Sequence, residues 1–300
     1  MRVQPFEPSY LPQLLDLINL HLGAVVPGWA LSGEFLAEHL ERDYTQPLTD
    51  PWVEERATLC AVDGGRLLAA AHLLRYGEGR EVSESYRGVG EINWFVALPG
   101  RGDASTRVLA SARERFANWK VRREYGWISG LPAVPMLGVP ESWPHVVTAL
   151  EDAGYSPAPN HHREALYGGG LDGVPAPGQP PVANLVVWQT VGSWGTRFSA
   201  VMGGEEIGFC EVVPEITRGG LLPALRGWAA LDGIRVREDW RDRGIGSHLV
   251  RRAVAWLRLE QFSKRMTLFE NAISSQRSVL FWLIADGSFL GKIHPFRERL

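Results

Sequence analysis

The sequence predicts an α/β protein built from two tandem copies of one unit, each an α+β mixed sheet with flanking helices. When the 300-residue chain is compared with itself at an offset of 140 residues, ATLCAVDGGRLLAA aligns without a gap with RFSAVMGGEEIGFC. At the same offset INWFVALPGRGDASTRVL aligns with DGIRVREDWRDRGIGSHL. Within each copy, two strand-like runs around a glycine turn are followed by a strand and then by helical spacing. One shared offset over these elements indicates a duplicated unit.

A glycine- and proline-rich stretch, GGGLDGVPAPGQPPVA at 168–183, separates the two copies. Such a composition is unfavourable for a helix or an inner strand, so we expect a linker there. The expected domains are therefore residues 1–167 and residues 184–300, and the second begins near the strand-like run LVVWQT.

The first copy carries two helical runs that the second copy lacks. SYLPQLLDLINLHL and SGEFLAEHLERD precede its hairpin, and Ser32 is placed to cap the second run. The second copy has only VGSWGT between its first strand and RFSAVM. We therefore expect any substrate wall made by such helices to be missing from the second copy or supplied by the first.

Composition and charge exclude several classes of protein. The formal net charge of -3 gives no broad basic field, so we expect no nucleic-acid partner. The two cysteines form no CxxC motif and the histidines have no metal-ligand spacing, so neither a disulfide framework nor a metal site is expected. The amphipathic N-terminus is unlike a signal peptide, and no apolar run is long enough to span a membrane. These features favour a cytoplasmic protein, and the excess of arginine over lysine favours a GC-rich bacterial source.

The segment from the WAALDGIRV strand into the following helix has the features of an anion site. The glycines Gly244 and Gly246 fall in the turn and in the first helical turn, where they weaken the helix but let the backbone approach a bulky group. The first-turn N–H groups are unpaired and lie at the positive end of the helix dipole. Together with Arg241 and Arg243 they favour a phosphate or pyrophosphate. A solvated, arginine-rich turn is the simpler alternative, and a nucleotide such as ATP is another ligand of this chemistry.

The stretch Arg241-Asp242-Arg243-Gly244-Ile245-Gly246 resembles the acetyl-CoA signature R/Q-x-x-G-x-G/A of the GNAT-type N-acetyltransferases. The order hairpin, strand, signature helix, strand and helix is also similar to that family. The resemblance implies acetyl-CoA as cofactor, with the pyrophosphate on backbone amides and the pantetheine arm on the preceding strand. The residues that it places at the cofactor are Ile234, Arg235, Val236, Arg241, Arg243, Gly244, Ile245, Gly246 and Ser247.

The first copy departs from this signature. Its aligned stretch is RGDAST at 101–106, which replaces both signature glycines and puts Asp103 where Arg243 stands. An acidic side chain beside a pyrophosphate is unfavourable. We therefore expect a weak or inactive cofactor site in the first copy, which would act as a scaffold or as part of the acceptor pocket.

Two acidic residues of the second copy are candidates for the catalytic base, since an amine must lose a proton to attack. Asp232 lies four residues before Val236, where the first copy has Ile92, and the family places an acid at a similar step in polyamine acetyltransferases. A bend or bulge at Asp232-Gly233 is the structural alternative. Glu211 is the second candidate, aligned with Ala71, although it could also lie on a solvated face. The late-helix tyrosine that many family members use as an acid has no counterpart here.

The sequence thus predicts an acetyl-CoA-dependent N-acetyltransferase with its cofactor site in the second copy. The expected acceptor is the primary amine of a small molecule, with a protein amino group as a second option. A non-catalytic acyl-CoA-binding or sensing protein is the alternative function. The internal duplication favours a monomer, and a homodimer stays open.

Overall fold

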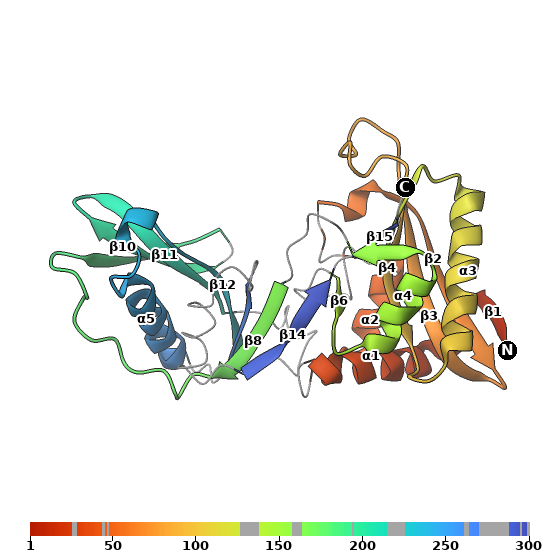
Figure 1. Cartoon of the computed structure of the whole chain (residues 1–300), viewed down its shortest axis with the longest axis horizontal. Helices are drawn as coiled ribbons and strands as arrows, with labels where there is room; N and C mark the ends of the chain where they lie inside the picture. Colours follow the sequence, from red (N-terminus) through yellow and green to blue (C-terminus); the bar gives the residue numbers. More distant parts are fainter. Residues whose placement is uncertain are drawn as a thin grey trace. The chain divides into compact units, whose positions relative to one another are not determined.

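The chain forms two compact units, residues 1–163 with 291–300 and residues 164–290 (Figure 1). The computed structural model describes all residues except 26–28, 44–45, 47, 127–137, 158–163, 194, 215–225, 261–263, 270–287, 295 and 299–300. Side chains are also not described at 157, 164–169, 232, 264–269, 288–294 and 296–298.

The first unit is a mixed sheet with helices packed on it. Its sheet has the order β1-β2-β3-β4-β5-β15-β7, in which β4 and β5 are parallel. Helices α1 and α2 pack on each other and on β2–β4, while α3 packs on β2–β4 and on α4. The elements are β1 (Arg2–Pro5), α1 (Leu11–Val25), α2 (Gly33–Glu41), β2 (Val53–Asp63), β3 (Arg66–Tyr76), β4 (Val89–Ala97), α3 (Gly102–Trp119), β5 (Arg123–Gly126), β6 (Val139–Pro140), α4 (Pro144–Asp152), β7 (Tyr155–Pro157) and β15 (Phe296–Glu298), with short 3-10 helices η1 (Pro8–Tyr10) and η2 (Asp50–Trp52).

The second unit has a sheet of order β8-β13-β12-β11-β10-β9 with α5 packed on β10–β12. The apolar stripe of α5, which includes Ile245, Leu249 and Ala253, packs against the sheet and forms the core with Phe198 and Ile207. The elements are β8 (Glu164–Gly170), β9 (Val186–Val191), β10 (Thr196–Met202), β11 (Glu205–Val213), β12 (Trp228–Val236), the 3-10 helix η4 (Glu238–Trp240), α5 (Ile245–Leu259), β13 (Lys264–Phe269) and β14 (Ser288–His294), which continues into the first unit.

Strands near the two predicted domain ends are exchanged between the sheets. β15, near the C-terminus, lies between β5 and β7 of the first unit. β8 follows the first copy in sequence and pairs antiparallel with β13 of the second unit. The compact units therefore differ from the expected division at 167 and 184. Gly168 to Gly170, which we expected in the linker, instead belong to β8, because strand pairing uses only their backbone groups.

The segment after β8 is anchored to the second unit. Leu171 and Val174 are buried in its core. The Arg258 guanidinium on α5 donates hydrogen bonds to the carbonyls of Leu171, Asp172 (3.0 Å) and Val174 (2.7 Å). The first part of the predicted linker is thus packed structure, held by a cation near the C-terminal end of α5.

The two predicted helical runs of the first copy are present as α1 and α2. The Ser32 hydroxyl accepts a hydrogen bond from the Phe35 N–H at 3.1 Å, as expected for the N-cap of α2. In the second unit only residues 192–195 lie between β9 and β10, so it has no counterpart of these helices at that point.

The duplication is real, but the single offset of 140 is wrong in detail. The hairpin turns Gly64-Gly65 and Gly203-Gly204, all with positive φ, are 139 residues apart. A β-bulge follows each turn at Leu68 and Ile207, which are again 139 apart. The buried positions of the next helices match at 141 instead, as in Ala112 and Ala253. The offset increases because the strand-to-helix connection is longer in the second copy, where it spans residues 237–244, than in the first, where it spans residues 98–101.

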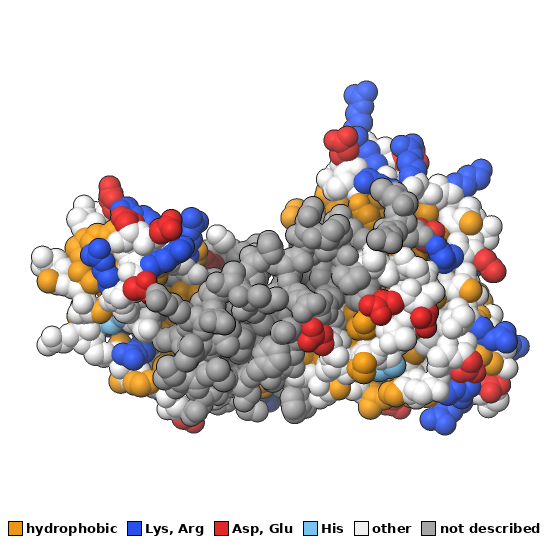
Figure 2. All heavy atoms as spheres, viewed as in Figure 1, with side chains coloured by type: hydrophobic (Ala, Val, Ile, Leu, Met, Phe, Trp, Pro, Cys, Tyr) orange, Lys and Arg blue, Asp and Glu red, His pale blue; other side chains and the backbone are white. Residues whose placement is uncertain are grey.

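The described surfaces of both units are mixed in charge. On the face drawn in Figure 2, basic and acidic side chains are interspersed on both units, without a large area of one sign. Among the described helices, none is both long and apolar enough to span a bilayer.

Candidate cofactor site

Beyond Leu231, strand β12 has one backbone edge that no described strand occupies. It pairs with β11 along its length, from Ala230 to Val236, but with β13 only from Trp228 to Leu231. β12 and β13 therefore separate after Leu231. The predicted residues Ile234, Arg235 and Val236 lie in the separated part, and the Ile234 side chain is 37 % exposed. Their backbone groups can pair with an extended ligand that enters between the two strands.

A β-bulge stands where the strands begin to separate. Glu211 pairs with Gly233, and the next residue on β11 pairs with Leu231, so Asp232 is the extra residue. The structural alternative considered for Asp232-Gly233, a bulge, is therefore present. A bulge re-aims side chains and is compatible with a functional role for this residue.

The connection from β12 to α5 ends in a left-handed glycine. Gly244 is the N-cap with φ 76, a conformation that disfavours other residues. The Arg237 N–H donates to the Ile207 carbonyl at 2.8 Å, which ties the start of the connection to the hairpin. A Cβ on Gly246 would lie 3.6 Å from Val236 Cγ2 and 3.7 Å from Ile234 Cδ1, so the first turn of α5 lies against the separated strand. The amides of Ile245, Gly246 and Ser247 are first-turn N–H groups without intrahelical acceptors.

The two signature arginines are held by main-chain carbonyls. Arg241 Nε donates to the Val236 carbonyl at 3.1 Å, and Arg243 donates to the Asp239 carbonyl at 3.1 Å while lying over the Trp240 ring. Arg237, by contrast, forms ion pairs with Glu205 and Asp239. The Arg237 hydrogen bond lowers the pKa of Asp239 and so keeps that carboxylate charged. The guanidinium groups of Arg241 and Arg243 are thus positioned near the helix start with their charge available to an anion.

Glu211 is buried, contrary to the solvated-face alternative, with a side chain that is 3 % exposed. Its carboxylate accepts a hydrogen bond from the Gly195 N–H at 3.2 Å and lies 3.6 Å from an Arg197 nitrogen. A Cβ on Gly192 would overlap this carboxylate. The register places Glu211 opposite Gly233, beside the bulge at Asp232, so the two predicted acidic residues occupy neighbouring backbone positions.

The first unit has the same strands but a closed edge. β4 pairs with β5 only from Val89 to Ile92 and then continues alone on that side among the described strands. However, every residue of β4 is buried. His145 Nε2, from the start of α4, lies 3.0 Å from the carbonyl of Ala97 and 3.0 Å from His21 Nε2. Side chains of the chain itself therefore occupy this position.

The signature turn is absent from the first unit. Its short connection leads directly into α3, with Arg101 rather than a left-handed glycine at the N-cap. The Nε and Nη2 atoms of the Arg101 guanidinium each donate a hydrogen bond to the Asp103 carboxylate, at 3.2 Å. The Arg101 cation is therefore already paired, and the connection of the first unit, 98–101, is shorter than that of the second, 237–244.

Sequence comparison misassigned two partners across the repeat. At the 139-residue offset Asp232 corresponds to Asn93, the bulge residue of β4, rather than to Ile92. Glu211 corresponds to His72 rather than to Ala71. The paired glycine turns would have indicated this offset. The closure by His145 and His21 was also missed, since those residues are far apart in sequence. The late helix without a tyrosine lies outside the described residues.

Comparison with known proteins agrees with this geometry. Residues 177–282 match the model of the acetyltransferase (GNAT) family. A GCN5-related N-acetyltransferase from Sphaerobacter thermophilus is similar over 99 % of this chain and 95 % of its own, with 15 % identity and a TM-score of 0.62. A tandem GNAT protein from the clavulanic acid biosynthesis pathway is similar over 98 % of this chain and 97 % of its own, with 14 % identity and a TM-score of 0.58. No curated protein matches the sequence.

The structural likeness at these identities concerns the fold, and it extends over both units. The family match covers the separated strand β12, the glycine turn and α5, the elements that form the candidate cofactor site. Residues 177–282 therefore match the acetyltransferase (GNAT) family, and the fold of the whole chain is similar to that of a tandem GNAT protein.

Proposed function

We propose that the second unit binds acetyl-CoA and that the chain transfers the acetyl group to the primary amine of a small molecule. The observation that carries this proposal is the edge of β12 beyond Leu231, which no described strand occupies and which leads to the glycine turn at the start of α5. The first unit, whose equivalent edge is filled by His145, then serves as a scaffold.

The residues of the second unit fit this cofactor. Gly244 gives the turn that aims the first-turn amides of Ile245, Gly246 and Ser247 outward, where they and the helix dipole favour a diphosphate. The guanidinium groups of Arg241 and Arg243 add charge-assisted hydrogen bonds. The backbone of Ile234 to Val236 offers strand-like pairing to an amide-containing arm. The cofactor supplies the acetyl group as an activated thioester.

The chain must also remove a proton from the attacking amine. Asp232 is proposed as the proton acceptor, because this acidic residue is the bulge residue of β12 at the point where β12 and β13 separate. Glu211 lies in the neighbouring register position and its carboxylate is held by Gly195 and Arg197. We assign it a supporting role, as an electrostatic partner or as a second step for the proton. Backbone N–H groups of the separated strand are suited to stabilise an oxyanion.

The proposed size of the acceptor rests on which helices cover the sheet of the second unit. The second unit has a four-residue connection where the first unit has α1 and α2, so its acceptor side has few walls of its own. A small amine is the proposed acceptor, and a protein amino group is the alternative that an open face permits. The proposal includes a cytoplasmic monomer without a nucleic-acid or membrane partner.

A non-catalytic acyl-CoA-binding protein is the second candidate function. The buried and ion-paired state of Glu211 favours it, since this carboxylate already has structural partners. The two functions differ in one measurable property, the release of free thiol that depends on an added amine.

The proposal is tested by thermal denaturation of the full chain with increasing acetyl-CoA. A ligand that binds only the folded state raises the midpoint, so the wild type should shift. Gly246→Glu should not shift, because its carboxylate would repel the diphosphate, while its Cβ position is free of close contacts. Thr106→Glu, at an exposed position near the start of α3 in the first unit, is the control and should shift like wild type.

Thiol release is then measured with monoamines, diamines, amino sugars and peptides. Amine-dependent release identifies the enzyme and its acceptor class. A thermal shift without any amine-dependent release would favour the sensing protein. A shift with ATP that equals the shift with acetyl-CoA would point to a nucleotide site, and equal shifts in wild type and Gly246→Glu would exclude the second unit as the cofactor site.

A further inference from the structure

The segment between β8 and β9 is fixed to the second unit at both of its ends. We call residues 171–185, the green segment between these strands in Figure 1, the strap. Arg258, near the C-terminal end of α5, binds main-chain carbonyls in the first part of the strap. In the last part Val182 packs against the core, and the buried Leu185 donates its N–H to the Val182 carbonyl at 3.3 Å. The strap is therefore a held segment.

Pro181 places the strap against the glycine turn of the candidate cofactor site. A Cβ on Gly244 would lie 3.4 Å from the Pro181 Cβ and 3.9 Å from its Cγ. Apart from the neighbours of Gly244 in the chain, no other described residue comes within 4 Å of that position. Pro181 thus stands on the side of Gly244 where an ordinary residue would carry its side chain. The strap therefore contacts α5 at its N-terminal end and, through Arg258, near its C-terminal end.

The strap is extended between these two contacts. Arg258 and Gly244 are 14 residues apart, which is about 21 Å along a helix axis. The seven steps from Val174 to Pro181 cover at most about 25 Å, and about 22 Å in the polyproline II conformation that the prolines of the strap favour. Residues 175–178 contain no turn or bend. The strap therefore has little slack, and the position of one contact constrains the other.

The glycine turn needs support because glycine adopts positive and negative φ about equally readily. Gly244 has φ 76, and in this conformation it is the N-cap of α5 and leaves the first-turn amides for a ligand. The His248 N–H donates to the Gly244 carbonyl at 3.0 Å, which holds the turn from the helix side. Pro181 restricts the turn from the other side.

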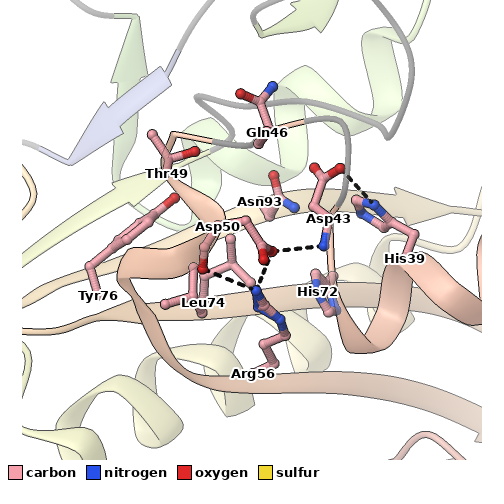
Figure 3. A pocket seen from close by; sticks show the side chains of 11 residues that line it. His39, Asp43, Gln46, Thr49, Asp50, Arg56, His72, Leu74, Tyr76 and Asn93 are labelled. Atoms are coloured by element: carbon pink, nitrogen blue, oxygen red, sulfur yellow. Dashed lines mark hydrogen bonds and ion pairs between the residues drawn. The ribbon is translucent and has the colours of Figure 1, made fainter.

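The Arg258 contact differs from that of an arginine that holds a loop in the first unit. Beside the small polar pocket drawn in Figure 3, Arg56 donates to the Asp50 carboxylate, which also accepts a hydrogen bond from the Asp43 N–H at 2.7 Å. A carboxylate there neutralises the cation. Arg258 has only carbonyl partners among the described hydrogen bonds and ion pairs, at the helix end where the dipole favours a cation. Its hold on the strap therefore depends on the main-chain geometry that brings these carbonyls together.

We propose that Pro181 is a positioning residue for the cofactor turn, and that the strap, anchored by Arg258, keeps it against Gly244. This inference rests on the proposed function, in which the same turn binds the diphosphate of acetyl-CoA. A turn that has the binding conformation only part of the time binds its ligand more weakly in proportion. The strap thus sets cofactor affinity from outside the signature.

The test combines calorimetric titration of the full chain with acetyl-CoA and hydrogen exchange of the ligand-free chain. Pro181→Gly should weaken binding about fivefold and speed exchange of the His248 amide, because Gly244 then loses its neighbour. Pro181→Ala keeps the Cβ and should bind within about twofold of wild type. Pro180→Gly changes the adjacent exposed proline, so it controls for the added freedom of the unfolded chain and should also bind within about twofold.

A second pair of variants tests the far contact. Arg258→Met removes the hydrogen bonds to the strap, and it should weaken binding about threefold and speed the same exchange. Arg252→Met changes an exposed arginine of α5 that is nearer to the turn, and it should leave both unchanged. Combined with Pro181→Gly, Arg258→Met should add little, since both act through the same contact.

Unchanged binding and exchange in Pro181→Gly would overturn the proposal, and so would faster exchange without weaker binding. Equal losses in Arg252→Met and Arg258→Met would assign the effect to charge and would also overturn it. Failure of the proposed function has a different result, because the wild type would then not bind acetyl-CoA while the His248 amide still responded to Pro181→Gly and Arg258→Met. The strap would then still position the turn, and only the identity of the ligand would be wrong.

Discussion

The two units carry the same hairpin, the same pair of bulges and the same separation of strands, yet only the second has the geometry of the proposed cofactor site. They differ in the connection from strand to helix, which is 98–101 in the first unit and 237–244 in the second. The longer connection has room for η4, and its left-handed Gly244 is the N-cap of α5, whereas the left-handed Gly100 of the shorter connection precedes the N-cap Arg101. The shorter one continues directly into α3. In the proposed function, the fold supplies the separated strands, and the connection sets whether the start of the helix can hold a diphosphate.

The strand edges differ in the same sense. β4 is wholly buried and its Ala97 carbonyl contacts His145, whereas Ile234 on β12 is partly exposed. In the first unit, side chains of the chain itself thus contact the end of β4. In the proposed function this contact favours stability, whereas the separated part of β12 in the second unit favours binding. The experiments below test whether the first unit stabilises the chain while the second unit binds the cofactor.

The largest expected effect on kcat comes from substitution of the bulge residue of the second unit, Asp232. Asp232→Asn should lower kcat roughly 10²–10⁴-fold, the usual contribution of a general base, with little change in acetyl-CoA affinity. Glu211→Gln should have a smaller effect on kcat, because that carboxylate is buried among structural partners. Steady-state kinetics and cofactor titration of both variants check this. If Glu211→Gln were the more damaging change, the roles of the two acidic residues would be reversed.

The next effect is the dependence of the stability of the first unit on pH. Burial is the main cause that lowers the pKa of His21 to about 4, from an ordinary value of 6.5. Between these values the unfolded chain binds a proton that the folded unit does not, so stability falls as the pH falls from 6.5 toward 4. At pH 5 the expected loss from His21 is about 2 kcal/mol relative to pH 7 or above.

Hydrogen exchange reads this loss in the first unit separately from the second. After correction for intrinsic exchange, α1 and α4 should lose protection at pH 5, and His21→Asn should remove most of that pH dependence. The burial of His72 and His145 also lowers their pKa values, so part of the dependence should remain. Equal pH dependence in wild type and His21→Asn would mean that the histidine contact at Ala97 is not a neutral, buried pair.

A matched pair of glycines tests the role of the connection. Gly244 has φ 76 and Gly100, in the first unit's connection, has φ 79. Replacing either by Ala should cost about 1 kcal/mol of stability, because both conformations disfavour a side chain. Only Gly244→Ala should also weaken acetyl-CoA binding, by about tenfold, since only this turn aims amides at the ligand. Calorimetric titration and denaturant unfolding separate the two effects. An equal loss of affinity in Gly100→Ala would assign a cofactor role to the first unit.

Much of this arrangement could be predicted from the sequence, because local patterns determine it. Strand alternation located the hairpins, Ser32 located the start of α2, and the glycine turn with its arginines located the candidate site. The offset was misjudged by one residue because an ungapped comparison averages the 139 of the strands and the 141 of the helices. That error moved the partner of Asp232 from Asn93 to Ile92 and concealed the bulge shared by both copies.

Other features could not be predicted because they depend on contacts between distant residues. His145 reaches the Ala97 carbonyl only after α4 has packed, and nothing in its local sequence indicates that contact. The exchange of β8 and β15 between the sheets likewise depends on pairing partners about 100 or more residues away. Gly168 to Gly170 were expected in a linker for this reason, since glycine-rich composition describes an isolated segment and not a strand whose backbone is paired.

The smallest expected effect concerns one exposed arginine in each unit. Arg243 stands beside the helix start of the second unit, held over the Trp240 ring, and its charge has no carboxylate partner among the described ion pairs. Arg101 in the first unit is paired with Asp103 instead. Arg243→Gln should weaken acetyl-CoA binding by about 1 kcal/mol, roughly fivefold, at low salt, whereas Arg101→Gln should leave it unchanged. Screening should shrink the difference between the two variants as ionic strength rises. Calorimetric titrations of both variants at two salt concentrations provide the check. An effect of Arg243→Gln that does not depend on salt would mean that this side chain acts through packing on Trp240 rather than through its charge.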